Sequence, residues 1–222
     1  MPIHMERYLE STLLRADAQK NDIRELCEKA LSFNFLGVCI NPFFVSYAAS
    51  ILQERALVVS VAGFPLGCTS GFVKAFEAEK AFKDGAHEVD MVINLAAVKS
   101  RERYIVTQEI KETAQTGPVV KVIIETGYLT TEEIAFACEC AAEGGAAFVK
   151  TSTGFGPRGA SVEDINLLRR FLPPQMGIKA AGGIKSAEFA EKLLLAGASR
   201  IGTSMAVQVF QQACRADKER KS

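Results

Sequence analysis

The sequence predicts a closed parallel (β/α)8 barrel that forms a single α/β domain. Eight short apolar runs alternate with helical stretches at a period of about 30 residues, and 222 residues are enough for one such domain. Three of the runs carry a lysine at equal spacing, because Lys121, Lys150 and Lys179 lie 29 residues apart. A doubly wound open sheet is the alternative, and it is less favoured because no glycine-rich dinucleotide motif follows the first strand.

Strands and helices are assigned from the hydrophobic period and from the turn residues that bound each run. The predicted strands span residues 8–14, 37–42, 57–64, 88–94, 119–126, 147–153, 177–183 and 200–204. The predicted helices span residues 21–33, 43–54, 71–85, 104–115, 130–145, 161–172 and 186–197, and a last helix begins near Ser204.

Several helix boundaries carry capping signals. Thr130, Ser161 and Ser186 are N-cap candidates, and Gly85 and Gly197 follow the last helical residues of their segments. The helix-to-strand turns define the lower rim of the barrel. Catalytic residues in this fold collect at the opposite rim, where strands end, so polar residues at strand ends are the candidates for function.

Composition excludes some classes of partner. Lys plus Arg and Asp plus Glu number 26 each, so the overall charge gives no reason to expect nucleic acid or an anionic membrane. The amino-terminal segment has no apolar signal region, and no apolar stretch approaches the ~18 residues of a membrane helix. We expect a cytoplasmic protein of one domain over residues 1–222, with residues 214–222 forming a loose charged tail.

Cysteine and histidine are not expected to form a metal site. The six cysteines do not resemble a disulfide framework, and only His4 and His87 could join them as ligands. We expect reduced cysteines, most of them packed in the core. His87 precedes a strand, so it is expected at the lower rim, away from any reaction.

The three lysines predict a site in which amines converge. A buried ammonium is costly, and positive neighbours lower the pKa of an amine until a nucleophilic neutral form exists near pH 7. Asp90 is the only acid inside the apolar run 89–95, and the lysines on the next three strands are its natural partners. Glu125 is a possible further acid. The alternative is a structural network of interior salt bridges, but three lysines leave positive charge that a ligand would have to balance.

Glycine-bearing strand ends late in the chain predict a phosphate site, because phosphates in such barrels bind after strands 7 and 8. Each glycine alone could be only a turn residue. The candidate segments contain Thr151, Gly154, Gly182, Gly183, Lys185, Gly202 and Ser204.

Taken together, these segments resemble the deoxyribose-phosphate aldolases, class I aldolases on a TIM barrel. The resemblance extends from residue 9 to about residue 207. It includes VCINP, GFPLG, EVDMVIN, KVIIET, FVKTSTGF, AAGGIK and RIGTS in that order.

The resemblance implies reversible cleavage of 2-deoxy-D-ribose 5-phosphate to acetaldehyde and D-glyceraldehyde 3-phosphate. It implies that Lys150 forms a Schiff base, that Lys179 lowers the proton affinity of this amine and takes part in proton transfer, and that Asp90 orders a water and relays the proton. Because an iminium is an electron sink, no metal or organic cofactor is expected. Lys121 would lie near the substrate hydroxyls or near Asp90. A homo-oligomer, a dimer or a tetramer, is expected through the family alone.

The resemblance also assigns the phosphate to Gly154, to Gly182 and Gly183 with Lys185, and to Gly202 with Ser204. Thr12 matches a threonine that contacts substrate. The chain departs from the family at two places. Glu10 and Ser11 occupy positions where many relatives have an aspartate and often a histidine, and Lys185 occupies a position where arginine is common. A carboxyl-terminal tyrosine used by some relatives is absent, since Tyr128 is the last tyrosine.

Two rival functions remain open from the sequence. One is a class I aldolase with a different phosphorylated sugar or aldehyde as substrate, and the other is a non-catalytic barrel that binds a phosphosugar. The intact set of Asp90, Lys150 and Lys179 counts against the second rival, because a barrel without catalysis would have no reason to keep this costly buried set.

Overall fold

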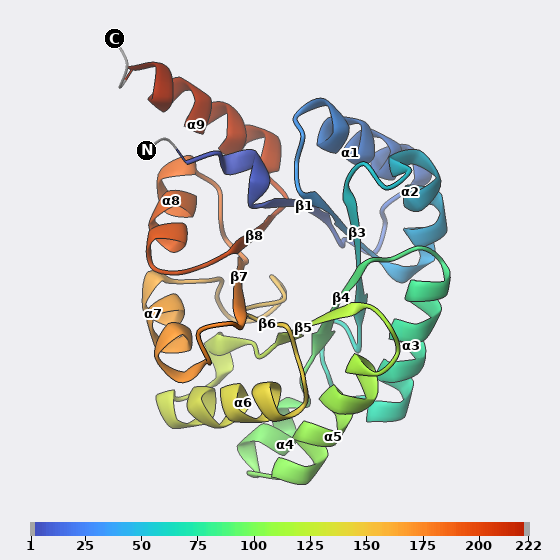
Figure 1. Cartoon of the computed structure of the whole chain (residues 1–222), viewed down its shortest axis with the longest axis vertical. Coiled ribbons are helices and arrows are strands. Elements are labelled where there is room, and N and C mark those ends of the chain that lie inside the picture. Colours follow the sequence, from blue (N-terminus) through green and yellow to red (C-terminus); the bar gives the residue numbers. More distant parts are fainter. Residues whose placement is uncertain (1–2, 220–222) are drawn as a thin grey trace.

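Eight parallel strands close into a barrel, and helices form a ring around it (Figure 1). The structure is a computed structural model that describes residues 3–219. The strands are β1 Leu9–Leu13, β2 Gly37–Ile40, β3 Leu57–Ala62, β4 Glu88–Val92, β5 Val119–Ile123, β6 Phe148–Lys150, β7 Gly177–Ala181 and β8 Arg200–Thr203. The predicted fold class is therefore confirmed, and each strand lies within its predicted segment.

The helices also follow the prediction, with one addition. They are α1 Lys20–Ser32, α2 Val45–Leu52, α3 Gly71–Lys83, α4 Leu95–Lys99, α5 Arg103–Ala114, α6 Thr131–Glu143, α7 Val162–Phe171, α8 Ala187–Leu195 and α9 Ala206–Glu219. Three 3-10 turns are η1 Met5–Arg7, η2 Pro42–Phe44 and η3 Thr126–Tyr128. The short α4 was not predicted, because five residues are too few to show a helical period.

Parallel pairing between the first and last strands closes the barrel. Glu10 of β1 is aligned with Gly37 of β2 on one side and with Gly202 of β8 on the other. Because side chains alternate between the two faces of a strand, this register sends Glu10 into the barrel and neighbouring Leu9 toward the helices. The same alternation in every strand separates an outer core from the barrel interior.

The outer core is apolar, whereas the interior is divided into two halves. Between strands and helices lie fully buried residues such as Val89, Met91 and Ile178. Inside the barrel, a small apolar cluster of Leu14, Cys39, Val59 and Val61 lies at the end of β1 and on β2 and β3, next to Phe64. The other half of the interior, facing β4 to β8 and β1, is filled largely by charged side chains.

A buried ion pair outside the barrel fixes the start of α4. Lys74 of α3 donates to Glu109 of α5 across 2.6 Å, and both side chains are buried. The second oxygen of Glu109 accepts the backbone N–H of Asn94 across 2.7 Å. Asn94 in turn caps α4 by accepting the backbone N–H of Ala97. The α3–α5 pair thus holds the chain at the carboxyl end of β4.

The predicted N-caps are confirmed. Thr130 and Ser161 form capping boxes with Glu133 and Asp164, and Ser186 accepts the backbone N–H of Phe189. His87 lies at the start of β4, where its Nδ1 atom accepts the backbone N–H of Val58 across 3.0 Å. This imidazole has a structural contact at the lower rim, as the sequence predicted.

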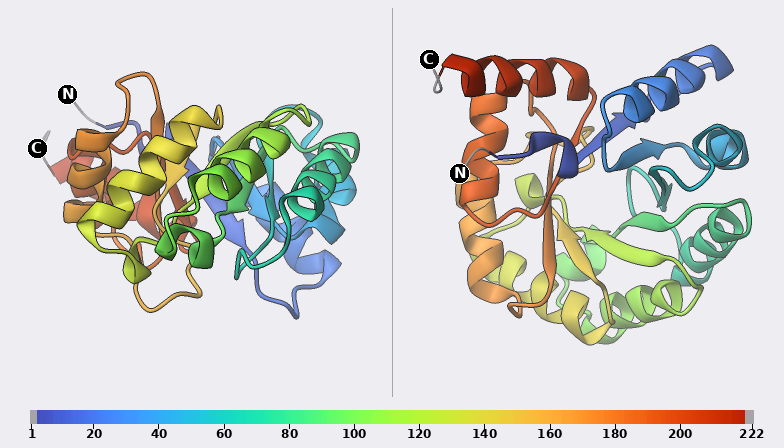
Figure 2. Two further views of the ribbon diagram at one scale, coloured as in Figure 1. Left: turned by 90° about the horizontal axis from the view of Figure 1, so that it is seen from below. Right: turned by 45° about the horizontal axis from the view of Figure 1, so that its top comes forward.

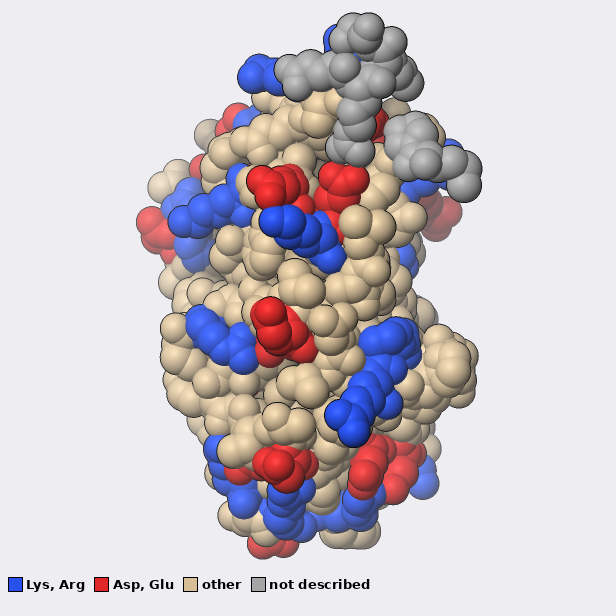
Figure 3. Space-filling view, turned by 90° about the vertical axis from the view of Figure 1, so that its left-hand side faces the viewer, with Lys and Arg blue, Asp and Glu red and all other residues tan. Residues whose placement is uncertain are grey.

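The helix α9 completes the ring beside η1, and both lie next to α8 (Figures 1 and 2). Residues 214–219 of the segment expected to form a tail belong to α9, and residues 220–222 lie outside the described residues. Charges of both signs are interspersed over the face that carries α7 and α8 (Figure 3). No helix in the described part of the chain is long and apolar enough to cross a membrane.

The capping box of α6 gives a test of local stability. Replacing Thr130 by Ala removes the side-chain acceptor of the Glu133 N–H, and this should lower the free energy of unfolding by about 1 kcal/mol. Urea denaturation measures the change. The neighbouring exposed residue Thr131, replaced by Ala, is the control and should change stability much less. Equal losses in the two variants would contradict the role of the cap.

Candidate active site

The site is built around one carboxylate that three amines share. Lys121 donates to Oδ1 of Asp90 across 2.9 Å. Lys150 and Lys179 both donate to Oδ2, across 2.7 Å and 2.6 Å. All four side chains are buried. The predicted convergence of the three lysines on Asp90 is therefore present in the structure.

Strand register explains why these side chains meet. Asp90 of β4 is aligned with Lys121 of β5, and Lys150 of β6 is aligned with Lys179 of β7. Because these four strands are parallel neighbours, side chains that point inward at similar heights come together on the barrel axis. Gly202 of β8 leaves room for the long amine, since a Cβ atom there would lie 2.9 Å from Cε of Lys179.

A second layer of charge lies below this group, and its members Glu88 and Arg200 were not predicted from the sequence. Lys179 also donates to Oε2 of Glu10. Nζ of Lys121 lies 2.6 Å from Oε2 of Glu88, and Arg200 lies 3.6 Å from Oε1 of both glutamates. The alternation of inward and outward side chains along each strand would have indicated these residues. Glu88 lies two positions before Asp90, and Arg200 lies two positions before Gly202, so each shares the inward face of its strand.

The two layers together leave one positive charge in excess when all groups are ionised. The cluster contains four cations, Lys121, Lys150, Lys179 and Arg200, and three carboxylates, Glu10, Glu88 and Asp90. From the sequence, three lysines against Asp90 alone would leave two positive charges in excess, and Glu125 as a further acid would leave one. The cluster is neutral when one lysine carries no proton.

Lys150 differs from the other two lysines in its contacts. Its amine contacts one carboxylate, whereas Lys121 and Lys179 each lie near Asp90 and at least one glutamate. Lys150 is also the one of the three that lines the cavity. The amine with the fewest carboxylate contacts is thus also the amine that a substrate in the cavity can reach.

The neighbours of Asp90 determine its protonation. Burial by itself raises the pKa of the Asp90 carboxyl, but the three lysine ammonium groups outweigh burial and hold that pKa well below its usual range. Burial favours the neutral amine of Lys179, but the carboxylates of Asp90 and Glu10 outweigh it and raise the pKa of Lys179. The same balance raises the pKa of Lys121. Asp90, Lys121 and Lys179 are therefore charged near pH 7.

Cys39 lies beside the charged group without adding to its charge. Its Sγ atom lies 3.7 Å from Oδ2 of Asp90. Burial raises the pKa of the Cys39 thiol to about 11, although Lys179 acts in the opposite direction. The thiol is neutral near pH 7, so it belongs to the apolar half of the interior.

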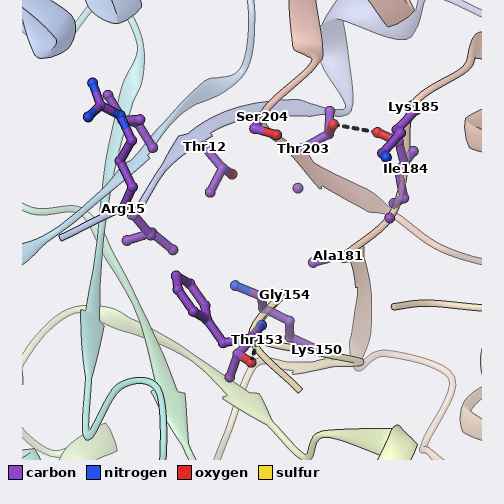
Figure 4. Close-up of a pocket in the computed structure, with 16 residues that line it drawn as sticks. Thr12, Arg15, Lys150, Thr153, Gly154, Ala181, Ile184, Lys185, Thr203 and Ser204 are labelled. Atoms are coloured by element: carbon purple, nitrogen blue, oxygen red, sulfur yellow. Dashed lines mark hydrogen bonds between the residues drawn. The ribbon is translucent and has the colours of Figure 1, made fainter. Parts of the chain in front are cut away.

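Above Lys150 a cavity of about 370 Å³ opens at the carboxyl ends of the strands. This volume is that of a typical small-molecule site. Lys150 extends into the space between Thr12, Ala181 and Ser204 (Figure 4). The other lining residues are Leu13, Leu14, Arg15, Thr153, Gly154, Phe155, Gly182, Gly183, Ile184, Lys185, Gly202 and Thr203.

One wall of the cavity has the features of an anion site. Gly154, Gly182 and Gly183 have φ values of +89°, +88° and +72°, which a residue with a Cβ adopts only with strain. Their backbones therefore border the cavity without side chains in the way. Lys185 and Ser204 line the same wall, and α9 begins two residues after Ser204. Bare backbone, a cation and a helix amino terminus together favour a bound anion.

The structure separates the predicted site residues into three groups. Thr12, Gly154, Gly182, Gly183, Lys185, Gly202 and Ser204 line the cavity together with Lys150. Asp90, Lys121 and Lys179 lie beneath it, in contact with one another or with Lys150. Thr151 is fully buried outside the cavity, where its hydroxyl bridges β6 and β7 by bonding both backbone groups of Ala181.

The expectation that Glu125 adds an acid to the lysine cluster is wrong. Glu125 has a left-handed backbone (φ +51°), and its Oε2 accepts both the N–H and the hydroxyl of Thr153, the former across 2.9 Å. The Thr153 hydroxyl in turn accepts the N–H of Phe155 across 3.0 Å. Glu125 therefore holds the β6–α7 turn that carries Gly154 to the cavity.

An ion pair anchors the far end of the same loop. Arg158 donates to both oxygens of Asp164 in α7, across 2.6 Å and 2.9 Å, and to the carbonyl of Thr126. At the mouth of the cavity, Phe155 packs edge-to-face on Phe64 with ring centroids 5.5 Å apart. The loop is thus fixed at both ends.

The cavity has a lysine at its base, two further lysines beside a shared carboxylate, and a wall with the features of an anion site. On a barrel, this arrangement defines a Schiff-base aldolase class of site. Comparison with known proteins agrees with this class. The profile of the DeoC/LacD family of aldolases matches residues 10–212. The chain belongs to this family.

Similar proteins extend over nearly the whole chain. A deoxyribose-phosphate aldolase of Thermococcus kodakarensis is 50% identical over 214 residues, covering 93% of this chain and 96% of the relative. The solved structure of an aldolase named QR15 has a TM-score of 0.92 at 38% identity and covers 97% of this chain and 98% of its own. The deoxyribose-phosphate aldolase of Aeropyrum pernix, described as a unique tetramer, has a TM-score of 0.86 at 32% identity and covers 93% and 89%.

The Glu125–Thr153 contact can be tested by stability. Replacing Thr153 by Val leaves the buried Glu125 carboxylate without its hydroxyl donor, and this should lower the free energy of unfolding by about 1–3 kcal/mol. Chemical denaturation measures the loss. Thr153→Ser keeps the hydroxyl and serves as the control, which should retain most of the stability. A Val variant as stable as the wild type would show that this contact does not hold the loop.

Proposed function

We propose that this protein is a class I aldolase that reversibly cleaves 2-deoxy-D-ribose 5-phosphate to acetaldehyde and D-glyceraldehyde 3-phosphate, with Lys150 as the Schiff-base lysine. The observation that carries the assignment of Lys150 is its position. It is the one amine of the buried cluster that borders the cavity, and Asp90 is the one carboxylate that it contacts. The identity to deoxyribose-phosphate aldolases supports the choice of substrate.

The reaction follows from amine and carbonyl chemistry. The neutral amine of Lys150 attacks the C1 aldehyde of the open-chain sugar, and the carbinolamine takes up one proton and loses one water to give an iminium. When the C3 hydroxyl loses its proton, the C2–C3 bond breaks and its electron pair moves to the iminium. D-glyceraldehyde 3-phosphate leaves, and the enamine that remains takes a proton at C2. Addition of water to the resulting iminium then releases acetaldehyde and one proton and restores the neutral amine of Lys150.

The proton steps require a group that accepts and returns protons beside the iminium. Asp90 and Lys179 are placed for this role, because Oδ2 of Asp90 bonds the amines of Lys150 and Lys179 at the same time. A proton released by Lys150 stays within a hydrogen-bonded chain. Asp90 would relay it through a water, and Lys179 would supply the compensating positive charge. Lys121 would hold the other oxygen of Asp90 and fix the orientation of the carboxylate.

The glycine-lined wall is the proposed phosphate site. Gly154, Gly182 and Gly183 offer backbone, and Lys185 offers a point charge near the amino terminus of α9. Thr12 and Ser204 lie on the same side of the Lys150 amine, at the ends of the adjacent strands β1 and β8, where they could bond hydroxyls of the sugar or oxygens of the phosphate (Figure 4).

We also propose that the protein is cytoplasmic and forms a homo-oligomer, a dimer or a tetramer. Free cysteines that include the buried thiols of Cys27 and Cys138 suit a reducing compartment. The reported tetramer of the Aeropyrum pernix relative supports an oligomer. Exposed aromatic side chains on α3 and α5, Phe72, Phe76 and Tyr104, offer apolar surface for such contacts.

Chemical trapping tests the role of Lys150. Borohydride reduction in the presence of acetaldehyde or deoxyribose 5-phosphate should attach the substrate carbon irreversibly to Lys150, as seen by peptide mass mapping. Lys150→Met, in which no imine can form at this position, is the control and should give neither adduct nor cleavage. An adduct on Lys121 or Lys179 in the wild type would refute the assignment.

Charge removal at Lys185 tests the phosphate site. Lys185→Met should raise the KM for deoxyribose 5-phosphate about tenfold or more, because one charge-assisted contact is lost, while kcat changes little. Lys185→Arg keeps the charge and should retain a KM near that of the wild type. Cleavage of unphosphorylated 2-deoxyribose is the second measurement and should be unaffected. An equal loss with both substrates would show that Lys185 does not act on the phosphate.

A further inference from the structure

Arg200 closes the charged cluster from the end of the barrel opposite the cavity. It is the first residue of β8, and its side chain is about one-fifth exposed, at 21%. The guanidinium lies over the ring of Phe148, 5.2 Å from the centroid. Gly177 makes room for this ring, because a Cβ atom there would lie 2.1 Å from it. Phe148 and Arg200 therefore lie at the lower end of the barrel.

Two chains of ion pairs connect Arg200 to the proposed nucleophile. Both chains begin at the guanidinium, where Nε lies 3.6 Å from Glu10 and Nη2 lies 3.6 Å from Glu88. Glu10 bonds Lys179, and Glu88 pairs with Lys121. Both lysines then bond Asp90, which bonds Lys150. A change of charge at the lower end is thus transmitted through buried groups, where water screens it little.

We propose that Arg200 is a positioning residue for the reaction, whose charge balances Glu10 and Glu88 and so allows Lys150 to be present as the neutral, nucleophilic amine. The inference rests on the proposed function, because it takes Lys150 as the Schiff-base lysine. Arg200 touches neither the cavity nor any reacting atom. It acts only through the charges between it and Lys150.

The charge count gives the reason. With Arg200 present, three cations other than Lys150 face three carboxylates, so the buried cluster is neutral when Lys150 has no proton. Without the guanidinium, the same cluster is neutral only when Lys150 is an ammonium. A buried cluster with net charge is costly, so the second case favours the protonated and unreactive form.

The other groups that face Lys150 do not alter this count. Cys39 on β2 is a neutral thiol. Arg15 lines the same cavity but pairs with Asp17 and Asp22, and Lys185 is exposed at the wall. The remaining charged groups, element by element, are Glu10 on β1, Glu88 and Asp90 on β4, Lys121 on β5, Lys179 on β7 and Arg200 on β8.

The experiment measures the rate of borohydride trapping with acetaldehyde as a function of pH, for the wild type and for charge variants. Arg200→Met should shift the rise of this profile to higher pH by about one unit, as one charge acting across a barrel interior would. Glu88→Gln removes a negative charge and should shift the rise to lower pH. Arg200→Lys keeps the charge and should stay close to the wild type.

A double variant separates charge from structural damage. Arg200→Met combined with Glu88→Gln restores the neutral count, so its profile should return toward that of the wild type even if both single variants lose stability. Damage to packing would not reverse in this way. Shifts of the same sign in the two single variants, or unshifted profiles in folded proteins, would overturn the inference. Should Arg200→Met alone fail to fold, the double variant is compared with Glu88→Gln, and equal profiles for these two proteins would overturn the inference.

Peptide mapping of the adduct in every sample keeps this inference distinct from the proposed function. An adduct on Lys150 with an unshifted profile contradicts the role of Arg200 and leaves the proposed function standing. An adduct on another lysine in the wild type contradicts the proposed function, and the role of Arg200 falls with it.

Discussion

The structure depends on a carboxylate that is shared by three amines in the middle of a barrel. Asp90 alone could not balance Lys121, Lys150 and Lys179, and a buried excess of positive charge would be strongly unfavourable. The lower layer of Glu10, Glu88 and Arg200 supplies the rest of the balance. The cluster is then neutral with three of its four cations charged, and in the proposed function the lysine that borders the cavity is the one that reacts. Stability of the interior and reactivity at the cavity are therefore set by the same count of charges.

The fold provides this arrangement through ordinary strand geometry. Side chains two residues apart share the inward face, so Glu88 lies below Asp90 and Arg200 lies below Gly202. Small residues leave space for the aliphatic part of a lysine side chain, as Gly202 does for Lys179. The apolar group of Cys39, Val59 and Val61 fills the opposite half of the interior and keeps water away from one side of Asp90. Above the charges, Glu125 and Asp164 hold the loop that brings Gly154 to the cavity.

Much of this could be predicted from the sequence, and the failures have physical reasons. The strands and most helices were predictable because each is a complete apolar or amphipathic run, whereas α4 is too short to show a period. Lys121, Lys150, Lys179 and Asp90 were found because a charge inside an apolar run is conspicuous. Glu88 and Arg200 escaped notice because they stand at the first position of their strands, where a charge looks like a solvated turn residue. Glu125 was misplaced because its left-handed backbone turns the side chain out of the inward pattern of β5.

The central claim is that the cluster at neutral pH holds one neutral amine and that it is Lys150. Nuclear magnetic resonance of protein labelled with nitrogen-15 in lysine distinguishes a neutral amine from an ammonium by the chemical shift of Nζ. The account predicts one neutral amine signal in the ligand-free protein at pH 7, absent from Lys150→Met, while the signals of Lys121 and Lys179 are those of ammonium groups. Ammonium signals for all three buried lysines, or a neutral signal that persists in Lys150→Met, would contradict it.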